Sequence, residues 1–291
     1  MKHVPINANR AGQIRIGHLE VNRLGFGAMR ITGKGIWGPP KDREGAVHLL
    51  KRAVELGVNF IDTADSYGPY VSEEIIAEAL FPYSGLLIAT KGGLVRSGPG
   101  RWQADCSPKH LRKACEDSLR RLKLDTIDLY QLHTVDPKVP FEESFKTLLE
   151  LQREGKIRYI GLSNIEPEHF LAAVNMGRFV SVQNNYNIYN HEHEDILKLC
   201  EQHRVAFIPY FPLAGSQEKL TGSNKFKNLA DRLRVSLAQL SLAWLLNHSP
   251  SILPIPGTSS MNHLEENISS AGIALEDEDM QLLDKLAENT T

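Results

Sequence analysis

Four residues of this chain have side chains that together suit the protonation of a carbonyl oxygen: Asp62, Tyr67, Lys91 and His133. Three of them end a short apolar run, and Tyr67 lies just beyond Asp62. A tyrosine phenol has an ordinary pKa of about 10, and a neighbouring ammonium group lowers it by about 1–3 units. We therefore expect Lys91 to activate Tyr67 as the proton donor and Asp62 to keep Lys91 charged. We expect His133 to donate a hydrogen bond to the same substrate oxygen.

This set of side chains contains no reductant, so the sequence predicts a bound hydride donor. Ser163, Asn164 and Gln183 lie at the ends of other apolar runs and suit a carboxamide, and Tyr210 suits stacking on a flat ring. Each residue alone has a plain alternative, because lysines at strand ends are commonly surface residues and histidines are commonly core residues. It is their joint occurrence that favours a site. Asp65, by contrast, is expected to start a helix or to face water.

The elements that must position these residues alternate between short apolar runs and longer amphipathic runs. Eight strand–helix units in 291 residues are typical of an α/β fold of the (β/α)8 type, the TIM barrel, whose active site lies at the carboxyl ends of the strands. A doubly wound sheet is the alternative, but "GFGAMR" lacks the third glycine of the usual dinucleotide fingerprint. The expected strands are residues 24–29, 58–64, 86–93, 126–133, 157–164, 179–187, 205–213 and 251–257.

Further elements are expected around this barrel. A hairpin is predicted at residues 13–24, and an extra amphipathic helix near the C-terminus. Residues 31–42 and 92–105 are expected to be long loops over the barrel mouth, where such loops are usually functional. We find no linker composition that divides the chain, so we expect a single domain over residues 1–291, with residues 1–11 as a poorly ordered tail.

Composition argues against several classes of function. The net charge is −2, so we expect no basic surface for nucleic acid. The apolar runs are all shorter than the ~20 residues of a membrane span. The three cysteines have no C-x-x-C spacing and the N-terminus has no signal pattern, so we expect a cytoplasmic protein. The histidines of "HEHED" at residues 191–195 would lie on different helix faces, so we expect no metal site.

The motifs around these residues resemble those of the aldo-keto reductase superfamily over nearly the whole chain. "NFIDTADSYG" is similar to the family's D-T-A-x-x-Y-G signature, and "ATKGG" and "LYQLHTVD" resemble two further motifs. The resemblance implies that Asp62, Tyr67, Lys91 and His133 are the family's catalytic aspartate, tyrosine, lysine and histidine. It also implies a nicotinamide cofactor, a small carbonyl compound as substrate and a monomeric protein.

The resemblance implies cofactor contacts after several strands. "IGLSN" places Ser163 and Asn164 on the nicotinamide carboxamide, "VQNNYN" adds Gln183, and Tyr210 matches the ring that stacks on nicotinamide. "PIPGTSSMNHLEEN" resembles the segment around the adenosine phosphates. The implied cofactor residues are Gly27, Ala28, Met29, Ser163, Asn164, Gln183, Tyr210, Phe211, Pro212, Leu213, Gly257, Thr258, Ser259, His263, Glu266 and Asn267.

NADPH is the expected cofactor, with NADH left open. Relatives that use NADPH often have an arginine or lysine in the last motif, and residues 253–268 contain neither. His263 and the neighbouring hydroxyl groups would then bind the 2′-phosphate. Lys219, Lys225 and Lys227 are candidates for further positive charge.

Within the superfamily, "WGPPKDR", "YGPYVSE", "PYFPL" and "IPGTSS" resemble bacterial pyridoxal reductases. Phe211 stands where many relatives have serine, and with Trp37 and Trp102 it would line a pocket for a flat aromatic aldehyde. The alternative is that these rings only pack loops. The predicted function is NADP(H)-dependent reduction of an aldehyde or ketone, with pyridoxal as a leading candidate. Two alternatives stay open: a non-enzymic regulatory barrel that binds the cofactor, and a Schiff-base aldolase with Lys91 as nucleophile.

Overall fold

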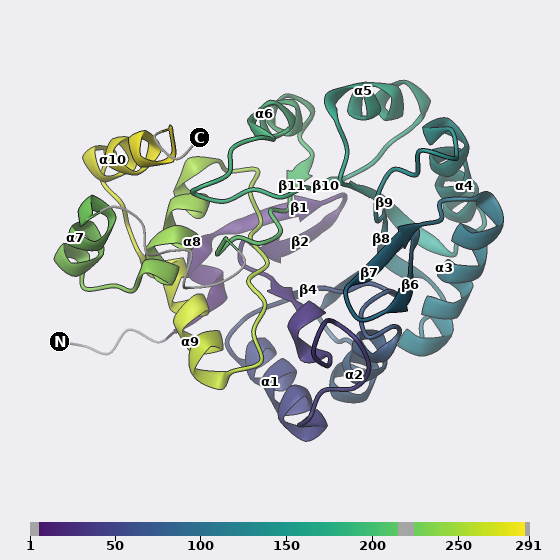
Figure 1. The fold of residues 1–291 in the computed structure, drawn as a ribbon, viewed down its shortest axis with the longest axis horizontal. Coiled ribbons are helices and arrows are strands. Elements are labelled where there is room, and N and C mark those ends of the chain that lie inside the picture. The colour runs from purple at the N-terminus through teal and green to yellow at the C-terminus, as the bar shows by residue number, and fades with distance from the viewer. Residues whose placement is uncertain (1–5, 215–223, 289–291) are drawn as a thin grey trace.

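The computed structural model describes residues 6–214 and 224–288, and within them a curled parallel sheet lies inside a layer of helices (Figure 1). The sheet order follows the chain, with each strand hydrogen-bonded to the next, as a (β/α)8 barrel requires. The predicted fold class is confirmed. The strands are β3 (Phe26–Gly27), β4 (Phe60–Asp62), β5 (Leu87–Gly92), β8 (Ile127–Leu132), β9 (Ile157–Ser163), β10 (Ser181–Gln183) and β11 (Ala206–Phe207).

Residues 251–257 take the eighth strand position and close the barrel between β11 and β3. On the β11 side, Phe207 N donates to Ser251 O and Leu253 N donates to Phe207 O, both at 2.8 Å. On the β3 side, Gly25 N donates to Pro254 O at 2.9 Å and Gly27 N donates to Pro256 O at 3.4 Å. Pro254 and Pro256 have no N–H group to donate. The segment therefore does not form the regular strand that was predicted, although it occupies the predicted place.

Helices surround the sheet, and most follow a strand in the predicted order (Figure 1). Ser107 caps one of them by accepting a hydrogen bond from His110 N, and Pro108 takes the first helical position, as predicted. The helices that follow strands are α1 (Arg43–Glu55), α2 (Val71–Leu80), α3 (Pro108–Leu122), α4 (Phe141–Arg153), α5 (Pro167–Met176), α6 (Glu194–His203), α8 (Leu237–His248) and α9 (Met261–Ser269). Two more, α7 (Asn224–Leu233) and α10 (Asp277–Glu288), pack on each other and on α8, and α7 was not predicted.

The predicted N-terminal hairpin is present as β1 (Gln13–Ile16) and β2 (Leu19–Asn22). It closes the amino-terminal end of the barrel, where Ile16 and Val21 pack with inward-facing residues of the strands. The 3₁₀-helix η1 (Ala8–Ala11) precedes it, with Ala8 buried and its N–H bonded to Leu56 O at 2.8 Å. The expectation of a poorly ordered tail is therefore wrong for residues 8–11. Residues 1–5 lie outside the described residues.

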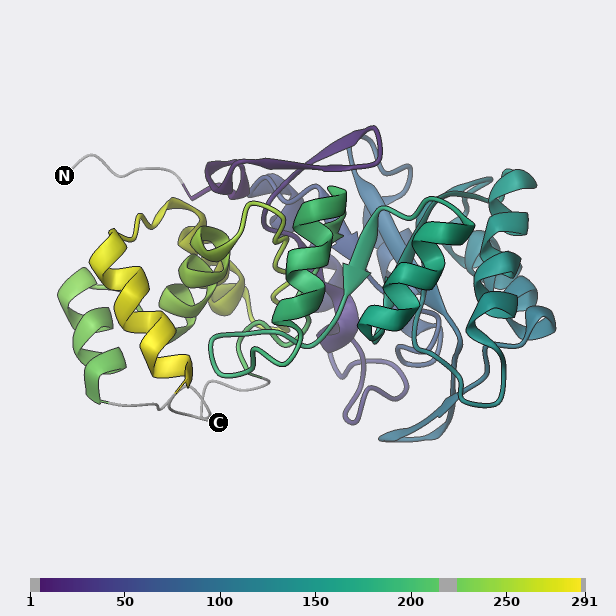
Figure 2. The same ribbon diagram turned by 90° about the horizontal axis from the view of Figure 1, so that it is seen from above.

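The predicted loop at residues 92–105 is instead a second hairpin, formed by β6 (Leu94–Gly98) and β7 (Arg101–Ala104). Gly100 turns the chain with a φ of +66°, so the "SGPG" stretch was an overlooked turn signal. Figure 2 shows the two hairpins at opposite ends of the barrel. The β6–β7 hairpin stands at the end where the strands terminate.

Candidate active site

A cavity of about 650 Å³ opens at the carboxyl ends of the barrel strands. This is where the barrel architecture places an active site. Residues from many separate parts of the chain line it: Gly27, Met29, Arg30, Asp62, Tyr67, Leu94, Trp102, His133, Ser163, Asn164, Gln183, Tyr210, Phe211, Pro212, Leu213, Ile255, Pro256, Gly257, Thr258, Ser259, His263 and Asn267.

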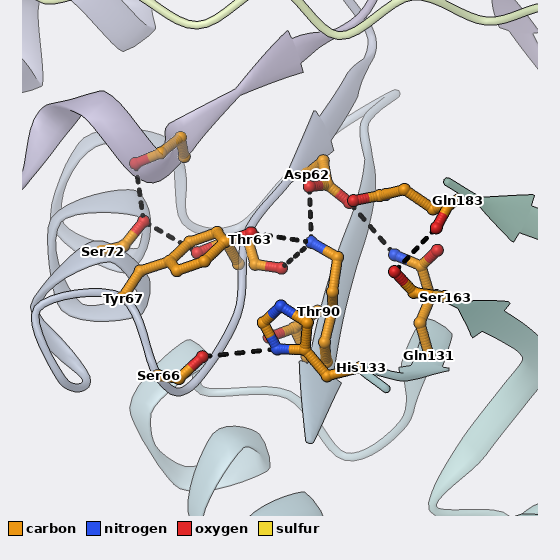
Figure 3. A network of polar contacts seen from close by, with 12 residues as sticks. Asp62, Thr63, Ser66, Tyr67, Ser72, Thr90, Gln131, His133, Ser163 and Gln183 are labelled. Carbon is orange, nitrogen blue, oxygen red and sulfur yellow. Dashed lines mark hydrogen bonds and ion pairs between the residues drawn. The ribbon is translucent and has the colours of Figure 1, made fainter. Parts of the chain in front are cut away.

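A buried ion pair between Lys91, on β5, and Asp62, at the end of β4, lies at the base of this cavity. Figure 3 shows Asp62 among the neighbouring polar side chains. Lys91 Nζ donates to Asp62 Oδ1 at 2.6 Å and to Thr63 O at 2.9 Å. The second oxygen of Asp62 accepts from the side-chain amides of Gln131 at 3.0 Å and Gln183 at 2.9 Å. Burial lowers the pKa of Lys91, but the Asp62 carboxylate and the remaining polar neighbours bring the pKa above its ordinary value. Lys91 is therefore an ammonium group at neutral pH.

Tyr67 lies against this pair, with its hydroxyl oxygen 3.4 Å from Lys91 Nζ and its ring centroid 5.1 Å from the same atom. Burial raises the pKa of Tyr67, and the charge of Lys91 lowers it by a smaller amount. The net direction is upward, so the predicted depression of the tyrosine pKa is wrong, because burial outweighs the ammonium charge. At neutral pH Tyr67 is a neutral phenol that still has its proton to give.

His133 follows β8, and its ring lies 5.8 Å from the ring of Tyr67, centroid to centroid. Its Nδ1 is 3.3 Å from Ser66 Oγ (Figure 3). Burial and the charge of Lys91 lower the pKa of His133 well below its usual value, so the imidazole is neutral at neutral pH. When Nδ1 accepts from Ser66, Nε2 carries the proton and can donate it in a hydrogen bond. This is the form that suits a ring orienting a carbonyl oxygen.

A chain of hydrogen bonds joins the predicted carboxamide contacts, all of which line the cavity. Ser163 Oγ donates to Gln183 O at 2.8 Å, and Asn164 Nδ2 donates to Ser163 Oγ at 3.2 Å. The same amide group donates to His133 O at 2.9 Å, while Asn164 Oδ1 accepts from Tyr210 OH at 2.8 Å. The network fixes these side chains in place before any ligand binds. A carboxamide entering here would share or replace some of these bonds.

At the other end of the cavity, the backbones of β3 and the closing segment approach closely. A Cβ atom on Gly27 would lie 2.6 Å from Ile255 O, and one on Gly257 would lie 2.4 Å from Gly27 O. Both positions therefore require glycine. Ser260 caps the following helix α9 by accepting a hydrogen bond from His263 N. Close backbone approach beside a helix N-terminus fits the phosphates of a dinucleotide.

Arg30 lines this end of the cavity and was not among the predicted residues. It lies in the 3₁₀-helix η2 (Ala28–Ile31) directly after β3, so the "MR" pair in "GFGAMR" was the available signal. Arg30 is a basic residue in the lining of the cavity, whereas the sequence prediction placed the candidate basic residues between positions 219 and 263. Lys225 and Lys227 do not line the cavity, and Lys219 lies outside the described residues.

Three of the predicted cofactor and substrate contacts do not line this cavity: Ala28, Glu266 and Trp37. The fully buried Lys91 does not line it either and lies behind Asp62 and Tyr67. Ala28 is fully buried. Trp37 lines a second cavity, of about 700 Å³, beside the N-terminus of α1, so the structure does not bring it into the first cavity with Trp102 and Phe211. Trp102 and Phe211 do line the first cavity and stay partly exposed, at 38% and 41%. Besides Arg30, the lining residues that were missed are Leu94, Ile255 and Pro256.

Asp65 is buried, which corrects the expectation that it faces water or starts a helix. It is 4% exposed, and no hydrogen-bond partner of its Oδ1 is present in the described part of the chain. Its N–H donates to Lys91 O, so the segment after β4 folds back against β5. Burial, and next the nearby carboxylate of Glu73, raise the pKa of Asp65 well above its ordinary value. Glu73 itself is paired with Arg121 at 2.6 Å.

Within residues 6–214 and 224–288, no three histidine, cysteine, aspartate or glutamate side chains are grouped as a metal site would need. The helices of the same residues are all too short or too polar to cross a bilayer.

Residues 23–288 match the model of the Aldo/keto reductase family, so the chain belongs to this family and is an NAD(P)H-dependent oxidoreductase. An uncharacterized oxidoreductase of Schizosaccharomyces pombe is 48% identical over 280 residues, covering 96% of this chain and 91% of the relative. Pyridoxine 4-dehydrogenase of Escherichia coli K12 is 41% identical over 279 residues, covering 94% of this chain and 97% of the relative. The crystal structure of an aldo/keto reductase from Klebsiella pneumoniae in complex with NADP and acetate has a TM-score of 0.79 and 28% identity, and the match covers 94% of each chain. The predicted resemblance is confirmed.

Proposed function

We propose that the protein reduces an aldehyde or ketone to an alcohol with NADP(H), and that pyridoxal is a leading candidate substrate. The observation that carries the proposal is the buried array of Asp62, Lys91 and Tyr67 at the base of a cavity, with neutral His133 beside it. The four side chains come from the ends of three strands, β4, β5 and β8, and the fold brings them together.

The proposed chemistry divides between a bound cofactor and this array. A nicotinamide cofactor supplies the hydride when it is bound. Tyr67 gives its proton to the carbonyl oxygen, and the charge of Lys91 stabilises the phenolate left behind. Asp62 keeps Lys91 protonated throughout. His133 donates from Nε2 to the carbonyl oxygen and so orients it toward Tyr67.

The cavity lining supports the proposed cofactor. Ser163, Asn164 and Tyr210 would hold and cover the nicotinamide end. At the other end, Arg30 and His263 are the basic groups among the lining residues, beside the glycine contact and the N-terminus of α9. A guanidinium binds phosphate through two parallel hydrogen bonds, so a contact between Arg30 and the adenosine 2′-phosphate, which NADH lacks, would favour NADPH. The neighbouring structure in complex with NADP agrees with this choice.

The two alternative functions receive less support. A Schiff-base aldolase needs a neutral lysine as nucleophile, whereas the pairing with Asp62 raises the pKa of Lys91 and keeps it charged. A regulatory barrel without catalysis would not need the complete array around Tyr67.

The similarity to an enzyme named pyridoxine 4-dehydrogenase, together with exposed Trp102 and Phe211 in the cavity, favours a flat aromatic aldehyde. A monomeric state and a cytoplasmic location remain predictions.

The test is to measure initial rates with pyridoxal and simple aldehydes, each with NADPH and with NADH. We expect Tyr67→Phe to lower kcat by at least ~100-fold, the lower range of a general-acid contribution, while NADPH still binds. Tyr83→Phe is the matched control, since Tyr83 is a buried tyrosine outside the cavity that donates to Leu122 O. Near-normal rates in Tyr67→Phe would refute the assignment of the proton donor. A preference below about twofold for NADPH would refute the choice of cofactor.

A further inference from the structure

Arg96, on β6, binds three separate segments of the chain through backbone carbonyl groups. Its guanidinium donates to the loop before α1, to the segment that carries Tyr67, and to the β6–β7 hairpin itself. The acceptors are Ile36 O at 2.9 Å, Gly35 O at 3.0 Å, Ser66 O at 3.1 Å, Arg101 O at 3.2 Å and Gly98 O at 3.4 Å. One side chain therefore connects the hairpin to the residue that immediately precedes the proposed proton donor.

The same guanidinium lies over the ring of Trp102, on β7, with its central carbon 3.6 Å from a ring centroid. Trp102 lines the cavity, and its ring makes edge contacts with Tyr67 at 6.4 Å and with His133 at 6.5 Å between centroids. Arg96 thus covers one face of the indole while the opposite part of the ring borders the proposed site of proton transfer. The orientation of Trp102 depends on what holds that covered face.

A guanidinium is suited to this task because it is planar and has five N–H donors. It can stack on an aromatic ring and bond to several carbonyl groups in its own plane at the same time. Burial lowers the pKa of Arg96, which is consistent with a cation whose partners here are neutral carbonyl groups rather than a carboxylate. A lysine has three donors on a compact group and cannot form this arrangement.

We propose that Arg96 is a positioning residue that holds Trp102 against the carbonyl-binding end of the cavity and thereby sets a preference for flat aromatic aldehydes. This inference rests on the proposed aldehyde reduction. Trp102 and Phe211 are the large apolar side chains that both line the cavity and stay more than a third exposed. A flat ring packed against a fixed indole gains about three- to tenfold in affinity from the aromatic contact. A small aliphatic aldehyde gains nothing from it.

The experiment compares kcat and KM for pyridoxal, benzaldehyde and propanal in the wild type, Arg96→Met, Arg96→Lys and Trp102→Leu. We expect both Arg96 variants to raise KM for the aromatic aldehydes and to lower the aromatic-to-propanal ratio of kcat/KM by about three- to tenfold. The Kd for NADPH and the kcat for propanal should stay close to wild type. Arg101→Met is the matched control, because it removes an exposed arginine of the same hairpin and keeps the Arg101 carbonyl.

A double variant tests whether Arg96 acts through Trp102. If it does, adding Arg96→Met to Trp102→Leu changes the aromatic-to-propanal ratio no further, because the two substitutions remove one shared effect. Equal, additive reductions of the ratio would show that Arg96 acts independently of the indole and would refute the proposal. The same conclusion follows if Arg96→Met alone leaves the ratio unchanged.

A second measurement does not need turnover. Protein labelled with 5-fluorotryptophan should show a ¹⁹F signal for Trp102, assigned from Trp102→Leu, that shifts or broadens in Arg96→Met but not in Arg101→Met. An unchanged signal in a folded Arg96→Met variant refutes the positioning role. If the wild type reduces no aldehyde with either cofactor, the proposed function fails, and the substrate preference inferred here fails with it. The ¹⁹F comparison still decides whether Arg96 holds the indole.

Discussion

Replacing Asp62 with asparagine removes one charge from the buried pair and leaves its shape almost unchanged. In the wild type, Lys91 Nζ is 2.6 Å from Asp62 Oδ1, and both side chains are at most 2% exposed. In Asp62→Asn, the ammonium group keeps Thr63 O and Tyr67 OH as neutral partners. An uncompensated buried charge is strongly destabilising, typically by ~3–5 kcal/mol.

The loss of unfolding free energy in this variant is limited, because Lys91 can become neutral by losing its proton. Deprotonation at pH 7 from the ordinary lysine pKa of 10.5 costs about 4.8 kcal/mol, at ~1.36 kcal/mol per pH unit. At pH 9 the same cost is about 2 kcal/mol. We therefore expect Asp62→Asn to lose about 3–5 kcal/mol of unfolding free energy at pH 7, and markedly less at pH 9.

The sign of this pH dependence follows from proton binding. The raised pKa of Lys91 in the wild type gives stability that is fully present below the ordinary lysine pKa and is lost only above it. In the variant the folded-state pKa is lowered, so the unfolded chain binds more protons. The stability of the variant therefore rises with pH by up to about 1.4 kcal/mol per unit.

Urea unfolding of the wild type and the variant at pH 7, 8 and 9 measures this difference. Asp128→Asn is the control, since Asp128 forms a partly exposed ion pair with Arg158 at 3.0 Å and should cost about 1 kcal/mol or less at every pH. Turnover of Asp62→Asn should fall by at least ~100-fold. A loss that is the same at pH 7 and pH 9, or no larger than that of the control, would show that Lys91 does not depend on Asp62 for its charge.

Two further substitutions test the buried aspartate and the unpredicted arginine. Because the pKa of Asp65 is raised, its contribution to stability is present at low pH, where the carboxyl group is protonated, and is lost as the pH rises. In urea unfolding, Asp65→Asn should therefore match the wild type near pH 4. At pH 7 the variant should be as stable as the wild type or more stable. A variant less stable than the wild type at pH 7 would contradict the burial argument. Arg30→Met should weaken NADPH binding by ~10-fold or more in a fluorescence titration and weaken NADH binding less, whereas Arg15→Met, at the opposite end of the barrel, should change neither. Equal losses for both cofactors would remove Arg30 from the 2′-phosphate.

The barrel and the proposed catalytic array were predictable because both follow from local patterns. Alternating strand and helix periods determine the order of the units, and the polar residues that end each strand must meet at one mouth. Lys91 and Asp62 could therefore be paired from sequence alone. The net pKa direction of Tyr67 could not, because it depends on how deeply the loop after β4 is buried.

The residues that were missed or misplaced depend on loops rather than on strands. Asp65 resembles a helix-start residue in sequence, and only the backbone bond to Lys91 O shows that its segment folds inward. Arg30 follows the first barrel strand, far in sequence from the motif in which a phosphate-binding cation was sought. Arg96 lies in a segment expected to be a loop, so its contacts with three segments had no sequence signal.

The proline-containing segment that closes the barrel also determines which amide protons can report on its junction with β3. Its junction with β3 is joined by the bonds that Gly25 and Gly27 donate to Pro254 and Pro256, and the prolines have no amide proton to exchange. A dinucleotide bound as proposed would contact Gly27 on one side of this junction and Gly257 on the other. At a concentration 100 times its Kd, such a ligand would add about 2.7 kcal/mol to the free energy of any opening that releases it. Cofactor binding and closure of the barrel would then be two linked equilibria. Hydrogen exchange at the amides of Gly25 and Gly27 would measure both.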